Sequence, residues 1–263
     1  MNRKAFYDAL RADKRVFPRG TLTEQQVTGM EGILDAFVTH GDRRKKTLAY
    51  ALATAYHEVG GRMVPVREGF ATTDAGARRA VNNLARRRGP NSAVAKYAKP
   101  DPDTGHVYYG RGHVQLTWKH NYKGSSDDAG VNLVENPDAM LDPVISARVL
   151  IRGLLDGRWN GRGKGIAHYL PTKGPDDLKN ARRTVNVTDK WAVIQTYYDA
   201  FLMAIERAGG VPRAKEPAAV PVEAENPSKV PQGIIAVIAA LIAAIAGAFG
   251  GDAANIISQL TGG

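Results

Sequence analysis

The sequence contains no cysteine. The fold therefore cannot depend on disulfide bonds, and the covalent structure would be the same in a reducing cytoplasm and in an oxidising cell envelope. Residues 1–8 read MNRKAFYD, which is basic but lacks the apolar core of a cleavable secretory signal. If the protein acts outside the cytoplasm, we expect it to leave by another route.

Motifs for several common chemistries are also missing. The chain has no G-x-G-x-x-G turn after a strand, no Walker loop and no G-x-S-x-G elbow, which argues against nucleotide-binding and esterase functions. His57 and Glu58 begin like the zinc-protease helix motif, but that motif needs a second His where this chain has Gly61. We therefore expect no metal site and no organic cofactor.

Acidic residues are fewer than basic ones, and the imbalance lies in the first 210 residues. The whole chain has 36 Lys and Arg against 26 Asp and Glu. Residues 1–210 hold 33 of the former and 22 of the latter, a difference of +11. Such a surface should attract polyanions such as teichoic acid or lipopolysaccharide phosphates, peptidoglycan carboxylates and anionic lipid. No nucleic-acid-binding fold signature accompanies the charge, so we expect no dedicated nucleic-acid partner.

Composition divides the chain into one domain and a tail. Residues 1–210 carry varied helical patterns, whereas residues 211–232 contain five prolines and almost no large apolar side chains. The latter segment is predicted to be an extended linker. Residues 252–263 form a short polar tail.

Between the linker and the polar tail, residues 233–251 read GIIAVIAALIAAIAGAFGG, without a charge. A membrane span needs about 20 apolar residues, so a transmembrane helix is the first interpretation and an amphiphilic or oligomerising tail the alternative. Small residues four apart, such as Ala239 and Ala243, permit tail-mediated self-association. With Lys229 before the span and Asp252 after it, the positive-inside rule keeps the domain in the cytoplasm.

Within the domain, the patterns predict a mainly α-helical fold. The first 60 residues indicate three helices, one of which starts at a capping box formed by Thr23 and Gln26. Asp142 before Pro143 indicates another start, and a longer helix is expected from Thr188. Residues 107–109 and 114–116 are expected to pair as a small hairpin. We expect two lobes with a cleft between them.

Two glutamates are candidates for acid and base chemistry. Hydrolysis of a glycosidic bond needs one carboxyl group to protonate the leaving oxygen and another to activate water or attack carbon. Glu58 lies at the edge of an apolar stripe at helical spacing, formed by Leu48, Ala51, Leu52, Ala55 and Val59. Partial burial there would favour the protonated form that a general acid requires. Glu68 is the natural partner.

The surrounding segments resemble one enzyme family when they are taken together. Residues 57–61 read HEVGG, residues 68–74 read EGFATTD and residues 108–122 read YYGRGHVQLTWKHNY. These segments, with VNLVENPD at 131–138 and ARRTVN at 181–186, resemble glycoside hydrolase family 19, the chitinase-like group, one branch of which consists of phage endolysins. The resemblance runs from about Phe6 to about Ala208. It implies a lysozyme-like fold.

The resemblance also implies roles for individual residues. Glu58 matches the family's general acid, Glu68 its general base and Thr117 a hydroxyl that helps to hold the attacking water. The residues that match substrate-contacting amides are Gln115, Asn121 and Asn186. Only ten positions separate Glu58 from Glu68, fewer than in the plant enzymes, and Asp74 is the alternative base. His113 and Val187 also depart from the family pattern, so we expect different substrate contacts at both positions.

Three further residues are candidate substrate contacts: His57, Tyr109 and Arg111. An amphipathic ring such as that of Tyr109 suits the mixed apolar and hydroxyl-bearing face of a sugar. Arg111 has two other interpretations, as the partner of any nearby carboxylate or as a group that orients Glu58. Gly110 and Gly112 could simply serve a tight turn, and we interpret Tyr108 as structural.

Together these features predict an endolysin that cuts the β-1,4 glycosidic bonds of bacterial peptidoglycan in the wall of a phage host, and that waits in the cytoplasm or at the inner membrane before lysis. The alternative enzyme is a chitinase, because chitin and peptidoglycan share a β-1,4-linked N-acetylhexosamine backbone. A third hypothesis is a membrane-disrupting or wall-binding protein that acts through its hydrophobic tail.

Overall fold

The computed structural model describes residues 1–160 and 163–214. They belong to one compact unit, Met1–Ala214. The predicted hydrophobic helix at 233–251, the polar tail and most of the linker lie outside the described residues, so these assignments stay predictions. Within the described residues, no helix is both long enough and apolar enough to cross a membrane.

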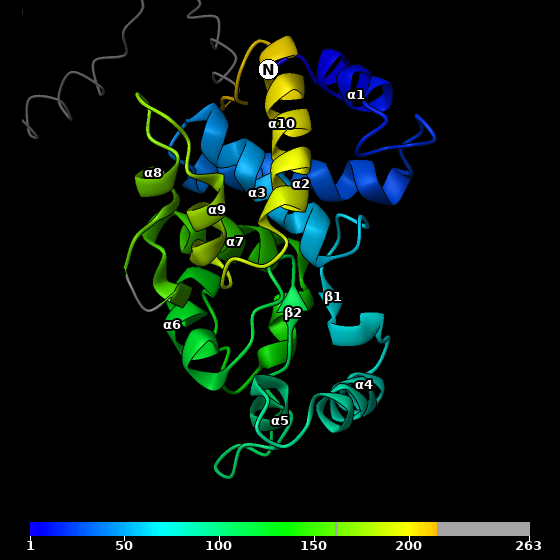
Figure 1. Ribbon diagram of the computed structural model, residues 1–263, viewed down its shortest axis with the longest axis vertical. Coiled ribbons are helices and arrows are strands. Elements are labelled where there is room, and N and C mark those ends of the chain that lie inside the picture. The colour runs from blue at the N-terminus through cyan, green and yellow to red at the C-terminus, as the bar shows by residue number, and fades with distance from the viewer. Residues whose placement is uncertain (161–162, 215–263) are drawn as a thin grey trace, which may run out of the picture. The chain divides into compact units, whose positions relative to one another are not determined.

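The predicted mainly α-helical fold is confirmed (Figure 1). In chain order the elements are α1 (Arg3–Ala12), α2 (Glu24–His40), α3 (Lys45–Glu58), β1 (Val66–Arg67), η1 (Glu68–Phe70), α4 (Asp74–Arg88), α5 (Ala93–Tyr97), β2 (Arg111–Gly112), α6 (Lys119–Ala129), η2 (Pro137–Leu141), α7 (Pro143–Asp156), η3 (Arg158–Asn160), α8 (Ile166–Tyr169), α9 (Leu178–Ala181), η4 (Arg182–Thr184) and α10 (Trp191–Arg207). The η elements are short 3₁₀ turns.

Local start signals in the sequence set the first residues of two long helices. The Thr23 hydroxyl accepts from the Gln26 amide at 3.1 Å and the Gln26 side chain accepts from the Thr23 amide at 3.0 Å, so the capping box is present. The Asp142 side chain caps α7 by accepting from the amides of Val144 and Ile145, and Pro143 is the first residue of the helix. The last helix begins at Trp191 and not at Thr188, because Lys190 adopts a left-handed conformation with φ 58°.

Helix α3 lies at the centre of the larger part of the fold. It packs against α10, α2 and α7, and every residue from Thr47 to Ala55 is buried. The sequence indicated one apolar stripe, but the helix is covered on all sides. Alanines at positions 49, 51, 53 and 55 explain this difference, since their small side chains let neighbouring helices approach every face.

The small sheet differs from the predicted hairpin. β1 pairs antiparallel with β2, with Val66 opposite Gly112 and Arg67 opposite Arg111. Residues 107–109 form no strand, and the 114–116 segment contributes one bridge, from Leu116 to Arg111. The motif at 108–117 is therefore a tight turn that is anchored to a strand far upstream, a long-range pairing that no local pattern reveals.

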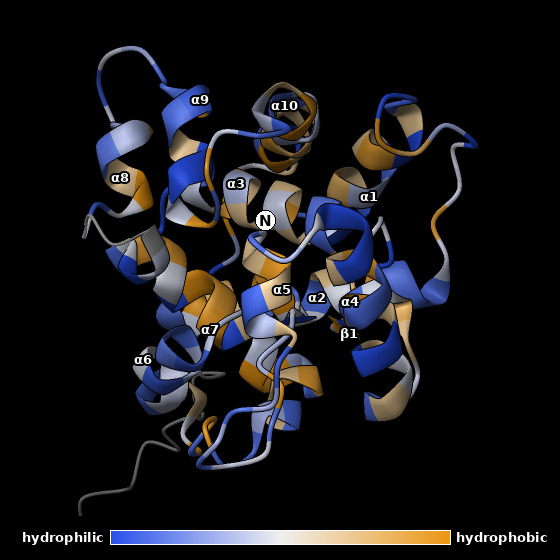
Figure 2. Cartoon of the chain, turned by 60° about the horizontal axis from the view of Figure 1, so that its bottom comes forward, coloured by the Kyte–Doolittle hydropathy of each residue, from blue (hydrophilic) through white to orange (hydrophobic). Residues whose placement is uncertain are grey.

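The described residues form two apolar clusters, as two lobes require. The larger cluster includes α1, α2, α3, α7 and α10. The smaller one contains residues of α4 and α5 and three that follow α5: Ala77, Val81, Val94, Ala98, Val107 and Tyr109. Figure 2 shows α4 as mostly hydrophilic outside this small core. We call residues 74–99 the small lobe.

Candidate active site

Glu58 is the last residue of α3, and the backbone beyond it reverses in a fixed way. The Gly61 amide donates to the Tyr56 carbonyl at 2.7 Å and the Gly60 amide to the His57 carbonyl at 3.2 Å. Gly60 is left-handed, with φ 57°. This is the Schellman type of helix end. It stops the central helix directly after Glu58 and places the carboxyl group at the edge of the core.

The structure gives Glu58 a charged partner that the sequence argument lacked. Nη1 of Arg182 lies 2.7 Å from Oε1 of Glu58, with the two side chains 2% and 14% exposed. The contact is an ion pair without hydrogen-bond alignment. The carboxyl group is therefore partly buried, as the sequence argument expected, and it lies beside a buried cation that the sequence argument did not include.

Glu68 follows β1 and is held by two hydrogen-bond donors. Its Oε2 accepts from the Gly110 amide at 2.9 Å and its Oε1 accepts from the Tyr97 hydroxyl at 2.9 Å. Burial raises the pKa of Glu68 above its usual value, and both donors act against that rise. Burial also raises the pKa of Tyr97. The phenol therefore keeps its proton and can donate a hydrogen bond to Glu68.

Two glycines shape the turn that carries the predicted amide and hydroxyl residues. A side chain at position 110 would meet Oε1 of Gln115 at 2.8 Å. Gly112 has φ 80°, and a Cβ there would meet Oγ of Ser146 at 2.7 Å. The interpretation of a tight turn is thus compatible with a site role, because the turn brings the backbone against Gln115.

The same turn holds non-glycine residues in uncommon conformations. Gln115 has φ 50° and Trp118 has φ 78°. Such residues cost about 1–3 kcal/mol each and cluster at functional sites. Thr117 lies between them, and its hydroxyl donates to the Gln115 carbonyl at 2.8 Å, which leaves its oxygen lone pairs for another donor.

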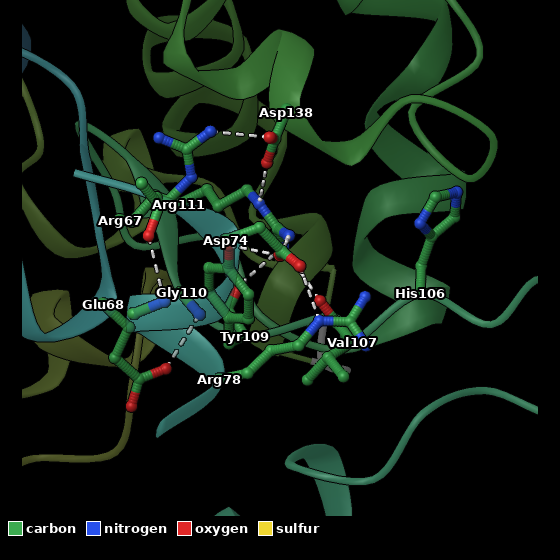
Figure 3. Close-up of polar contacts among 12 residues, drawn as sticks. Arg67, Glu68, Asp74, Arg78, His106, Val107, Tyr109, Gly110, Arg111 and Asp138 are labelled. Carbon is green, nitrogen blue, oxygen red and sulfur yellow. Dashed lines mark hydrogen bonds and ion pairs between the residues drawn. The ribbon is translucent and has the colours of Figure 1, made fainter. Parts of the chain in front are cut away.

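Arg111, which belongs to this turn, contacts a tyrosine ring and two aspartates (Figure 3). Its guanidinium lies 3.6 Å from the centroid of the Tyr109 ring, and its Nε donates to Asp138 at 2.7 Å. A second contact reaches Asp74 at 3.4 Å, and Nη1 donates to the Tyr122 hydroxyl at 3.1 Å. Arg111 therefore pairs with these two aspartates, and Arg182 is the cation that contacts Glu58.

A groove of about 1070 Å³ brings the predicted acid, base and amides together. It is lined from the large side by Glu58 and by residues near 159 and 183–189, and from the other side by α4 and α5 of the small lobe. The predicted site residues on its wall are Glu58, Glu68, Gln115, Thr117, Asn121 and Asn186. Val187, where we expected an altered substrate contact, is also on the wall.

Other predicted site residues lie away from the groove wall. Tyr109 is fully buried and donates to Asp74 at 2.8 Å, and Arg111 is buried beside it. The His57 ring faces Tyr197, with 6.3 Å between ring centroids. Asp74, the alternative base, does not line the groove either, because Tyr109, Arg78 and Arg111 engage its carboxylate.

His113 is buried, so the difference from the family pattern at this position does not alter a substrate contact as we expected. Burial lowers its pKa to about 4. The neutral ring lies between Met63, whose carbonyl is 3.1 Å from Nε2, and Ser146, whose hydroxyl is 2.9 Å from Nδ1. These partners fit a ring that donates to the carbonyl and accepts from the hydroxyl, which ties β2 to α7.

Several residues of the site were not found from the sequence. Trp118 lies inside the motif between Thr117 and Asn121. That position would have been enough to name it as a candidate site residue. Arg182 lies in the 181–186 segment, but nothing local indicates its contact with Glu58. The remaining wall residues that we did not anticipate include Arg88, Tyr97, Trp159, Arg183 and Asp189.

The groove combines three carboxyl groups, amides, hydroxyl groups and aromatic rings. Carboxyl groups can transfer protons to and from a bridging oxygen and a water molecule, and amides and aromatic rings suit a hydroxyl-bearing polymer. Among residues 1–160 and 163–214, no three His, Asp or Glu side chains gather in a way that could hold a metal ion. The arrangement suits acid and base hydrolysis.

Several known proteins are similar to this chain. The family model for chitinase class I, Glyco_hydro_19, matches residues 4–155. Endochitinase 1 of Theobroma cacao is 31% identical over 136 residues, 49% of this chain and 39% of that protein. Chitinase 11 of Oryza sativa subsp. japonica is 51% identical over 118 residues, 36% of this chain and 46% of that protein. The chain thus spans less than half the length of these two relatives.

Among solved structures, chitinase C from Streptomyces griseus HUT6037 is similar, with 20% sequence identity and a TM-score of 0.44 over 82% of this chain and 81% of that chain.

Proposed function

Because the chain belongs to glycoside hydrolase family 19 (chitinase class I), we propose that it hydrolyses the β-1,4 glycosidic bonds of bacterial peptidoglycan. The observation that supports this most is that Glu58 and Glu68 line the same groove. An isolated surface glutamate would have no such partner. The groove also carries the amides of Gln115, Asn121 and Asn186 for contacts with N-acetyl and hydroxyl groups.

In the proposed mechanism, Glu58 protonates the bridging oxygen as the bond to the anomeric carbon breaks. Glu68 removes a proton from a water molecule that attacks this carbon from the opposite face. The Thr117 oxygen accepts a hydrogen bond from the water's other hydrogen, which stays on the new hydroxyl group. The product anomer is then inverted. Inverting hydrolases place their carboxyl groups about 6.5–9.5 Å apart, and retaining ones about 5 Å. Nuclear magnetic resonance of the fresh product anomer distinguishes the two.

Replacing Tyr97 with Phe should move the acidic limb of the kcat/KM profile to higher pH. The Tyr97 hydroxyl favours the ionised form of Glu68, and a base must be ionised to accept a proton. Without this donor the pKa of Glu68 rises, so activity at mildly acidic pH falls first. The pH dependence of sacculus hydrolysis measures the shift.

The matched control is Tyr7→Phe, which also removes a bond from a phenol to a carboxylate, here to Glu31 at 2.6 Å, on α1 away from the groove. Its profile should follow the wild type. In the Tyr97 variant the aromatic ring at position 97 is retained, and with it the edge contact with Trp118, so the packing is preserved. An unchanged acidic limb in the Tyr97 variant would show that Glu68 is not the base.

Mass spectrometry of the products from purified sacculi tests the function itself. We expect muropeptides with new reducing ends, from which the sugar at the cut identifies the bond. Release of free peptides would point to an amidase and contradict the proposal. Chitin oligomers are the second substrate, because the curated relatives are named as chitinases. Hydrolysis of chitin oligomers but not of sacculi would make the chain a chitinase.

The proposed biological role is lysis of a phage host, with the enzyme held in the cytoplasm or at the inner membrane until the membrane opens. The charge-free segment 233–251 supports this proposal, since it has the length of a membrane span. A tail that itself disrupts membranes is the alternative. Lysis of whole cells by the isolated segment would favour that alternative.

A further inference from the structure

The small lobe carries a disproportionate share of the positive charge. Residues 74–99 contain seven Lys and Arg and one Asp, a net charge of +6 in a chain whose total is +10. Arg78 pairs with Asp74 at 2.6 Å. The other six cations are exposed and have no carboxylate partner among the described residues: Arg79, Arg86, Arg87, Arg88, Lys96 and Lys99.

Helix stability explains only part of this charge. Cations in the last turn of α4 interact favourably with the negative end of the helix dipole, which accounts for residues 86–88. Arg79 lies in the middle of α4, and Lys99 lies beyond α5, so the dipole does not account for them. The excess belongs to the surface of the lobe as a whole, which borders the groove.

This positive surface enters the groove at Arg88. Arg88 lines the groove from the small lobe, and Arg183 lines it from the large lobe. Arg183 bonds to the neutral side chain of Asn180 at 2.9 Å. The carboxylates on the wall have other partners: Glu58 and Asp189 contact Arg182, at 2.7 and 4.0 Å, and Glu68 accepts from Tyr97 and Gly110. Neither Arg88 nor Arg183 is neutralised within the groove.

We propose that Arg88 and Arg183, continued by the exposed cations of α4 and α5, bind the carboxylates of the stem peptides on a glycan strand that lies in the groove. This inference rests on the proposed function. An unsubstituted N-acetylglucosamine polymer is neutral and leaves both guanidinium groups without a counter-ion. A strand bearing peptides offers a carboxylate at regular intervals, and guanidinium groups match carboxylates in geometry and charge.

The test combines two enzymes with two substrates. One substrate is sacculi stripped of teichoic acids, and the other is the same sacculi after carbodiimide amidation, which neutralises the carboxylates and keeps the glycan. We expect the wild type to lose about tenfold in kcat/KM on amidation, as the loss of two exposed charge pairs implies. The Arg88→Gln/Arg183→Gln variant should start about tenfold lower and respond little to amidation.

The matched control is Arg19→Gln/Lys173→Gln. It also removes two exposed positive charges that have no carboxylate partner among the described residues, and neither lines the groove. It should follow the wild type on both substrates. If the arginine variant loses as much on amidation as the wild type does, the inference is wrong.

Two further outcomes are distinguishable. A difference between wild type and arginine variant that appears only on walls retaining teichoic acids would assign the surface to phosphate and overturn the carboxylate proposal. If the wild type releases no muropeptides from either substrate, the proposed function fails, independently of the two arginines.

Discussion

Replacing Glu58 with Gln is expected to lower the rate of sacculus hydrolysis by about 10² to 10⁴, the usual contribution of a positioned general acid. Gln has the shape of Glu but cannot donate a proton to the bridging oxygen at a useful rate. Its side chain fills the same space beside the buried Arg182, so the fold should be retained. Clearing of purified sacculi, followed as turbidity, measures the effect, and circular dichroism checks the fold.

Glu135→Gln is the matched control, because Glu135 is exposed and does not line the groove. That variant should clear sacculi at the wild-type rate. If the Glu58 variant also does so, its carboxyl group is not the acid and the two-carboxylate mechanism is wrong. A variant that is inactive but unfolded would instead show that the contact with Arg182 is structural, and catalysis would then be tested in Glu58→Asp.

The second large effect is expected for stability. Arg111→Leu should lower the free energy of unfolding by about 3 kcal/mol, at the lower end of the cost of breaking a buried ion pair. The lower end applies because Asp138 is 41% exposed and can be rehydrated. The Val107 carbonyl, by contrast, is left with no partner for the bond it accepts from Arg111. Urea denaturation of the full chain measures the change.

Arg78→Leu offers a direct comparison, because Arg78 also pairs with Asp74 but at a surface site, with the side chains 32% and 39% exposed. Exposed pairs contribute about 0–1 kcal/mol, so this variant should be nearly as stable as the wild type. If both variants lower the free energy of unfolding equally, burial of the Arg111 guanidinium does not increase its contribution to stability.

Local features of the fold could be predicted because short-range chemistry sets them. The capping residues Thr23 and Asp142 and the end of α3 at Glu58 each depend on side chains and amides within a few positions. The hairpin and the start of α10 could not be predicted in this way. One depends on a pairing with Val66 far upstream, and the other on the backbone of Lys190, whose side chain does not indicate a left-handed conformation.

The site residues divide in the same way, into those that a contiguous motif identifies and those whose contacts depend on distant parts of the chain. Gln115, Thr117 and Asn121 were predicted because the motif that contains them resembles a family segment, and all three line the groove. Arg182 and Tyr97 were not predicted, since their partners are 124 and 29 positions away in the sequence and only the folded chain brings them together. For the same reason Arg111 was given several possible partners, and the structure shows which carboxylates it contacts.

The two glutamates are attached to parts of the molecule that differ in resistance to local opening. Glu58 ends a helix that is buried from Thr47 to Ala55, so the amides of that buried run should exchange with solvent only on global unfolding. Glu68 follows a strand of two residues and borders a lobe with a small core of its own. Amides of α4 and α5 are therefore expected to exchange with solvent sooner than those of α3.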